Sequence, residues 1–305
     1  MATRTLDNSP NILPLYARAA APMVPGASLL PFVPGGGGEI PELDLRLEGV
    51  KADPAAVAEY AKVCGFALRD SLPVTYPHVL AFPLHMAVMA DGGFPFGAVG
   101  LVHVENRIEQ QRPVGVTEEL SIRVRPTPLQ PHAKGRTFSL LTEVRVGEEL
   151  VWSSASTMLR RGKGSPEASP GEKHLTVPTT TPASAEWKLG GDLGRRYAGV
   201  SGDRNPIHMH SLTAKPLGFP AAIAHGMWTK ARCLAALDSR LPDAFAADVR
   251  FRKPILLPAR VEFASAAEGE QIAFAVRDAK RQTPHLDGCV SPLEPNSKAK
   301  TGRKK

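Results

Sequence analysis

A set of short sequence landmarks occurs twice in the same order, and this repetition limits the folds open to the chain. Residues 60–65 (YAKVCG) resemble residues 197–202 (YAGVSG), 137 positions later. Residues 79–84 align with 222–227 at an offset of 143, and residues 112–114 with 253–255 at an offset of 141. Three matches in one order predict a duplicated fold, with each part of the 305 residues forming the same unit.

Each half shows the same succession of hydrophobic periodicities. A short helix is predicted where apolar residues recur at helical spacing, near residues 57–64 and again near 193–200. A longer helix follows, Leu84–Ala90 in the first half and Ala224–Leu237 in the second, and it is apolar on nearly every side, so it must be buried. Alternating residues then indicate strands: Leu120, Ile122, Val124, Phe138, Leu140, Val261, Phe263, Ile272, Phe274 and Val276. The pattern predicts an α+β fold, with an antiparallel sheet curled around a helix.

Composition places the boundaries of these units. Residues 1–40 are rich in Pro, Ala and Gly and are expected to form an N-terminal arm or loop. The two repeats are expected at 41–162 and 183–290, joined by a Gly/Ser/Pro/Thr linker at 163–182. Residues 291–305 form a basic tail that we expect to be disordered, as such terminal charge runs usually are.

The bulk numbers exclude several classes of protein. Of the net charge of +7, five positive charges lie in the last eight residues, and no aromatic-interleaved basic stretch accompanies them, so nucleic-acid binding is not expected. The three cysteines form no C-x-x-C pair, which argues against a disulfide framework or a zinc site. No apolar run approaches the roughly 20 residues of a membrane span, and no signal pattern opens the chain. We expect a cytoplasmic protein.

The residues able to perform chemistry cluster in SGDRNPIH, residues 201–208. Gly202 and Pro206 are expected to end the preceding helix and leave Asp203 and His208 on an irregular loop. A carboxylate beside an imidazole can hold a water and take its proton. Asn205, between them, is suited to bonding the loop backbone or a carboxylate. The alternative for Asp203 is a structural Asx turn or helix cap, and a lone His208 is more often structural than catalytic.

Gly226 is expected in the first turn of the buried second-half helix. Amide groups at a helix N-terminus lack intrahelical partners and lie at the positive end of the dipole, so one of them can bind an oxygen that gains negative charge. The alternative is that glycine only permits tight packing there. His208, His210 and His225 do not have the spacing of a known metal motif, so no metal is expected, and His225 is predicted to bond the loop.

Together, SGDRNPIH, the following Gly-Phe and residues 224–227 (AHGM) resemble the hydratase motif of the MaoC-like, (R)-specific enoyl-CoA hydratase family. The resemblance implies a double hot-dog fold and reversible hydration of trans-2-enoyl thioesters to (R)-3-hydroxyacyl thioesters, without a cofactor. It implies catalytic roles for Asp203 and His208, an oxyanion amide at Gly226, and contact between the acyl chain and Leu234 and Leu237.

The resemblance further implies that the acyl group is carried by coenzyme A or acyl carrier protein, and that the unit is a monomeric double hot-dog or a homodimer. Arg250, Arg252 and Lys253 are candidates for the carrier's phosphates, with an ordinary solvated strand end as the alternative. The competing functions are a hot-dog thioesterase and a non-catalytic acyl-thioester binder or accessory subunit.

The first repeat provides an internal comparison. At offset 137, Phe66 and Ser71 stand opposite Asp203 and His208, and at offset 143 Pro83 stands opposite Gly226. Proline has no amide hydrogen to donate. We therefore expect the first half to be a degenerate repeat that lacks the chemistry.

Overall fold

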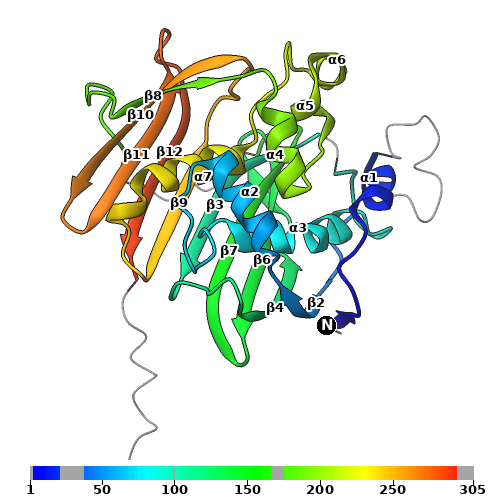
Figure 1. The fold of residues 1–305 in the computed structure, drawn as a ribbon. Helices are drawn as coiled ribbons and strands as arrows, with labels where there is room; N and C mark the ends of the chain where they lie inside the picture. Colours follow the sequence, from blue (N-terminus) through cyan, green and yellow to red (C-terminus); the bar gives the residue numbers. More distant parts are fainter. Residues whose placement is uncertain (1–2, 21–37, 99, 166–174, 294–305) are drawn as a thin grey trace, which may run out of the picture.

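A computed structural model describes residues 3–20, 38–98, 100–165 and 175–293 (Figure 1). Its strands form one sheet in the order β1-β2-β4-β6-β7-β3-β9-β12-β11-β10-β8, with β5 paired to β6. The strands of the first part are β1 (Arg4–Leu6), β2 (Leu45–Lys51), β3 (Leu101–Gln110), β4 (Glu119–Pro126), β5 (Gln130–His132), β6 (Gly135–Val146) and β7 (Glu149–Arg161). Those of the second are β8 (Ala185–Leu189), β9 (Phe245–Phe251), β10 (Ala259–Glu268), β11 (Gln271–Asp278) and β12 (Pro284–Pro292).

The sheet order shows the predicted duplication directly. Strands β2-β4-β6-β7-β3 of the first half are matched, in reverse, by β9-β12-β11-β10-β8 of the second. Strands β3 and β9 join the halves as an antiparallel pair, from Glu105 opposite Arg250 to Gln110 opposite Phe245. The α+β double hot-dog predicted from the sequence is therefore confirmed.

One central helix accompanies each half of the sheet, α3 (Tyr76–Met89) in the first and α7 (Gly226–Leu237) in the second. Helix α3 begins eight residues earlier than predicted and contains Pro83 within it. Helix α7 begins two residues later than predicted, because Ile223 pairs with Leu256 and the Ala224 amide donates to the Ile255 carbonyl at 3.0 Å. These bonds hold residues 223–224 in an extended bridge.

Two shorter helices, α2 (Pro54–Cys64) and α4 (Leu193–Ser201), form where the helical stripes predicted them and pack on each other. Each ends at a glycine with positive φ, Gly65 at 84° and Gly202 at 76°. Both glycine amides donate to the carbonyl four residues earlier, so the two helix ends are equivalent and the offset of 137 is correct here.

The alignment of the central helices, however, was wrong by nine residues. The Ser71–Gly115 bridge and the bond from the Leu72 amide to the Val114 carbonyl (2.8 Å) repeat the bridge that precedes α7. Val74, and not Pro83, therefore occupies the position of Gly226. The error arose because the second half inserts three short helices between its first helix and the bridge: α5 (Pro206–Met209), α6 (Ser211–Ala214) and η3 (Lys215–Leu217).

The predicted N-terminal arm contains regular structure among its described residues. Strand β1 pairs in parallel with β2, and helix α1 (Ile12–Ala20) packs against α3. The helix was not predicted, because the composition of residues 1–40 is dominated by the Pro and Gly residues that follow residue 20. Residues 166–174 of the linker and 294–305 of the tail lie outside the described residues.

A continuous hydrophobic core runs through both halves and includes Leu234 and Leu237 of α7. The longest described helix, α3, has 14 residues, and no described helix is both long and apolar enough to cross a membrane.

Candidate active site

The loop after α4 places Asp203 at the end of that helix. Gly202 takes up the left-handed conformation that stops α4, and Pro206 begins α5 three residues beyond Asp203. His208 lies inside α5, a single turn, and not on an irregular loop as predicted. Asn205 caps this turn: its side-chain oxygen accepts from the Ile207 amide at 3.4 Å.

The two carboxylate oxygens of Asp203 have different surroundings. Oδ1 accepts hydrogen bonds from the Asn205 amide at 3.1 Å and from the Tyr16 hydroxyl at 3.0 Å. Oδ2 lies 3.9 Å from Nε2 of His225. The side chain keeps 29% of its surface exposed. The carboxylate is thus held through Oδ1, and Oδ2, on the side of the histidines, can accept a further hydrogen bond.

His208 and His225 stack on each other, with ring centroids 3.6 Å apart. The Nδ1 atom of His208 lies 2.8 Å from the Ile223 carbonyl, and a carbonyl only accepts, so Nδ1 carries the proton and Nε2 has the free lone pair. Nε2 of His225 lies 3.0 Å from the Asp203 backbone carbonyl. His225 therefore bonds the loop, as predicted, and fixes it against the start of α7.

The electrostatics of the group favour a charged acid beside neutral imidazoles. Burial lowers the pKa of His208, and it lowers the pKa of His225 to about 3, with the neighbouring His208 contributing. Burial alone would raise the pKa of Asp203, but His225, His208 and hydrogen bonds from the Asn205 amide and Tyr16 outweigh it, and the pKa is lowered. At neutral pH the site combines a carboxylate with an unprotonated ring nitrogen.

Gly226 directly follows His225 and opens α7. His225 is the N-cap residue but makes no side-chain capping bond to the described helix, so the first amides of α7 are not capped in that way. A Cβ atom on Gly226 would lie 2.9 Å from Cε1 of Phe251. Close packing thus requires glycine here, as the alternative interpretation of the sequence expected. The uncapped start of the helix is also compatible with binding of an anionic oxygen.

Leu234 and Leu237 lie about two and three turns further along α7. Leu234 is 0% and Leu237 1% exposed, and both belong to the hydrophobic core. The structure therefore does not bring them to the surface of the site, and their contact with an acyl chain stays a prediction.

Within the described chain, Asp203, His208 and His225 form a group whose possible ligand atoms lie within 4.8 Å of one another. A metal ion needs lone pairs that converge on it. The two imidazoles are stacked at an interplanar angle of 24°, so their in-plane lone pairs run nearly side by side. The arrangement fits proton transfer better than metal coordination.

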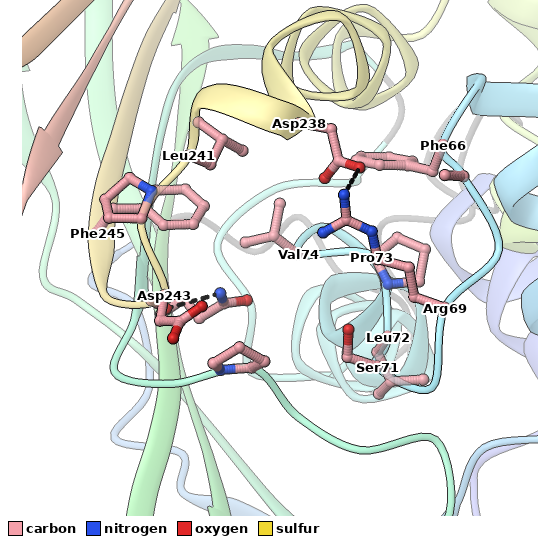
Figure 2. A pocket seen from close by; sticks show the side chains of 14 residues that line it. Phe66, Arg69, Ser71, Leu72, Pro73, Val74, Asp238, Leu241, Asp243 and Phe245 are labelled. Carbon is pink, nitrogen blue, oxygen red and sulfur yellow. Dashed lines mark hydrogen bonds and ion pairs between the residues drawn. The ribbon is translucent and has the colours of Figure 1, made fainter.

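A hollow lined by residues of both halves lies beside the first-half segment that corresponds to this site (Figure 2). Phe66 takes the place of Asp203, and Val74 takes that of Gly226. Only five residues separate Gly65 from Ser71, so no residue corresponds to His208. An ion pair between Arg69 and Asp238 at 2.8 Å occupies the rim. On this alignment the first half has no carboxylate or imidazole at these positions, and its lack of the chemistry stays a prediction.

Several side-chain contacts of this half were not predicted from the sequence. Tyr16 reaches Asp203 from 187 residues away. Lys230, fully buried in α7, donates to Oδ1 of Asn106 at 2.6 Å and to the Ala247 carbonyl at 2.8 Å, which ties α7 to both central strands. Arg250 and Arg252, the candidate phosphate ligands, pair instead with Glu105 at 3.1 Å and Asp287 at 2.6 Å.

Comparison with known proteins identifies the family. Residues 167–288 match the family model described as MaoC like domain. Over 267 residues the chain is 38% identical to 3-hydroxyacyl-thioester dehydratase X of Mycobacterium tuberculosis, covering 88% of this chain and 95% of that relative. The chain belongs to the MaoC-like dehydratase family. A second relative, the 3-hydroxybutyryl-CoA dehydratase of Methylorubrum extorquens, is 37% identical over 70 residues, which are 22% of this chain and 45% of that relative.

Solved structures agree with this MaoC-like assignment. The crystal structure of HtdX from Mycobacterium tuberculosis superposes with a TM-score of 0.73 at 38% identity, covering 82% of this chain and all of that one. A MaoC-like dehydratase from Phytophthora capsici shares the fold with a TM-score of 0.66 at 19% identity, covering 83% of this chain and 96% of that one.

Proposed function

We propose that this MaoC-like protein catalyses the reversible hydration of trans-2-enoyl thioesters to (R)-3-hydroxyacyl thioesters, at a single site in its C-terminal half. The observation that carries the proposal is the group formed by the free Oδ2 of Asp203, the unprotonated Nε2 of His208 and the start of α7. Membership of a family of dehydratases supports the same reaction.

The chemistry follows from the protonation states. A water held between Asp203 and Nε2 of His208 loses a proton to this pair as its oxygen attacks C3 of the enoyl group. Electron density moves to the thioester oxygen, where the Gly226 amide at the positive end of α7 stabilises the charge. The pair then returns a proton to C2. Both protons come from water, so the reaction needs no redox cofactor.

We propose coenzyme A or acyl carrier protein as the acyl carrier, because the name of the full-length relative specifies a thioester and that of the shorter one a CoA ester. One chain already contains both halves of the double hot-dog, which supports a monomer as the minimal unit. All three cysteines are free and buried, which suits a reducing compartment, and we place the reaction in the cytoplasm.

The direct test is to incubate the protein with trans-2-enoyl-CoA esters of several chain lengths and follow the absorbance of the conjugated double bond, with a thiol reagent in a parallel reaction. The proposal predicts loss of absorbance without release of free thiol. Thiol release would indicate a thioesterase, and an unchanged signal at every chain length would indicate a binding protein.

A further inference from the structure

Helix α1 packs beside the proposed catalytic loop although it precedes that loop by almost two hundred residues. It contacts α3, and Cδ1 of Ile12 lies 2.9 Å from the place that a Cβ atom on Gly202 would occupy. Figure 1 shows α1 (blue) at the side of α3, on the part of the molecule that also holds α5. This helix therefore packs against the glycine that ends α4, immediately before Asp203.

Tyr16 of α1 forms two hydrogen bonds with this loop. Its hydroxyl oxygen accepts from the Arg204 amide at 2.7 Å, and the hydroxyl lies 3.0 Å from Oδ1 of Asp203. An amide can only donate and a carboxylate can only accept, so the directions of both bonds are fixed. The single hydroxyl hydrogen must be directed at Asp203. The ring is half-buried, and its place is fixed by packing as well as by these bonds.

The hydrogen bonds to Asp203 decide which of its carboxylate oxygens can react. Oδ1 already accepts from Tyr16 and from the Asn205 amide, whereas Oδ2 faces Nε2 of His225 at 3.9 Å. With Oδ1 bound at two points, the carboxyl group is prevented from rotating. A water that gives up its proton to Asp203 must then do so at Oδ2.

We propose that Tyr16 is a positioning residue for the reaction: its hydroxyl holds Oδ1 of Asp203 so that Oδ2 faces the substrate water. The inference rests on the function proposed above, and it assigns part of the site to the N-terminal segment outside both repeats. Tyr16 touches neither the water nor the acyl group in this role.

The role has a pH signature. Asp203 is faced by His225 and His208 from the second half and by Tyr16 from α1, with Tyr197 of α4 next to His225 at 4.8 Å between ring centroids. A hydrogen bond to the charged form of a carboxyl group lowers its pKa, so removing the Tyr16 hydroxyl raises the pKa of Asp203. The acid limb of the hydration profile then moves to higher pH.

The test compares Tyr16→Phe with wild type in steady-state hydration of a trans-2-enoyl-CoA across pH. We expect kcat to fall roughly tenfold, as for the loss of one hydrogen bond to a charged group, with KM changed by less than about twofold. Tyr76→Phe is the matched control, because it removes the hydroxyl of a tyrosine buried in α3 and is expected to leave kcat and the acid limb unchanged. An unchanged kcat and acid limb in Tyr16→Phe, or a rise in KM alone, would overturn the proposal.

A second measurement separates this proposal from the function itself. The Asp203 carboxyl carbon can be titrated by ¹³C NMR, with its signal assigned through its loss in Asp203→Asn. We expect a higher Asp203 pKa in Tyr16→Phe than in wild type, whether or not any enoyl thioester is hydrated. Equal Asp203 pKa values in the two proteins would refute the positioning role, while an inactive wild type with a shifted pKa would refute only the proposed reaction.

Discussion

At the scale of single residues, Gly226 combines a packing requirement with a proposed electrostatic role. The Phe251 ring lies 2.9 Å from the place that a Cβ atom on Gly226 would occupy. Gly226 also begins α7, whose N-cap residue His225 stacks on His208. Phe251 in turn packs on His103 of β3, with ring centroids 5.0 Å apart. The helix start is thus fixed by side chains from both central strands.

These two roles of Gly226 can be separated by a compensating substitution. We expect Gly226→Ala to lower the free energy of unfolding by about 1–3 kcal/mol, because the methyl group overlaps the Phe251 ring. Adding Phe251→Leu makes room and should recover most of that loss in urea denaturation. If the double variant recovers stability but not kcat, the position acts in the reaction; if it recovers both, glycine is there for packing alone.

The sequence identified the candidate residues of the loop, but it did not identify the distant residue that contacts them. Asp203, Asn205 and His208 stand within six residues, so a local motif could identify them. Tyr16 could not be identified, because its contact with Asp203 depends on how the N-terminal segment folds back across the molecule.

At the scale of elements, the insertion between α4 and α7 distinguishes the half proposed to be catalytic from its counterpart. Helices α5, α6 and η3 occupy this insertion, and α5 brings His208 under the bridge at Ile223. Periodicity correctly predicted helices α2 and α4 and strands β4, β6, β10 and β11, since those patterns depend only on neighbouring residues. The match of residues 79–84 with 222–227 misaligned α3 with α7, because the second half inserts α5, α6 and η3 before its central helix.

The end of α4 gives a second prediction with a matched control in the same helix. Gly202 has a φ of 76° and lies against Ile12, so Gly202→Ala should destabilise the protein by about 1–2 kcal/mol. Gly199 is exposed, and a Cβ atom there meets nothing within 4 Å, so Gly199→Ala should instead stabilise it by roughly 0.5–1 kcal/mol. Thermal unfolding measures both. A similar change in stability for the two variants would contradict the left-handed cap.

At the scale of the whole molecule, several imidazoles are held in the neutral form. Burial lowers the pKa of His78 to about 4, and it lowers those of His103 and His225 to about 3, with neighbouring charges contributing. Burial also lowers the pKa of His85 and of His208. Because the unfolded chain binds these protons near pH 6.5, the unfolded state binds more protons below that pH.

We therefore expect the free energy of unfolding to fall as the pH decreases from about 6.5 toward 4, on the order of 1–2 kcal/mol for each buried imidazole by pH 5. Urea titrations at pH 7, 6 and 5 measure this. His78→Leu should reduce the pH dependence, because it removes one of the buried imidazoles. Equal stability at pH 7 and pH 5 would show that the imidazoles are not buried in the neutral form.

The two halves of the sheet are alike in topology but unlike in chemistry, since the first half has Phe66 and Val74 where the second has Asp203 and Gly226. We propose that only the second half catalyses the hydration. The most direct measurement is the hydration rate of a trans-2-enoyl-CoA with Asp203→Asn and His208→Ala, each checked for native folding by circular dichroism. We predict that kcat falls at least about a hundredfold in each variant, as expected for loss of a general acid–base group. Hydration at near wild-type rate in either folded variant would contradict the account.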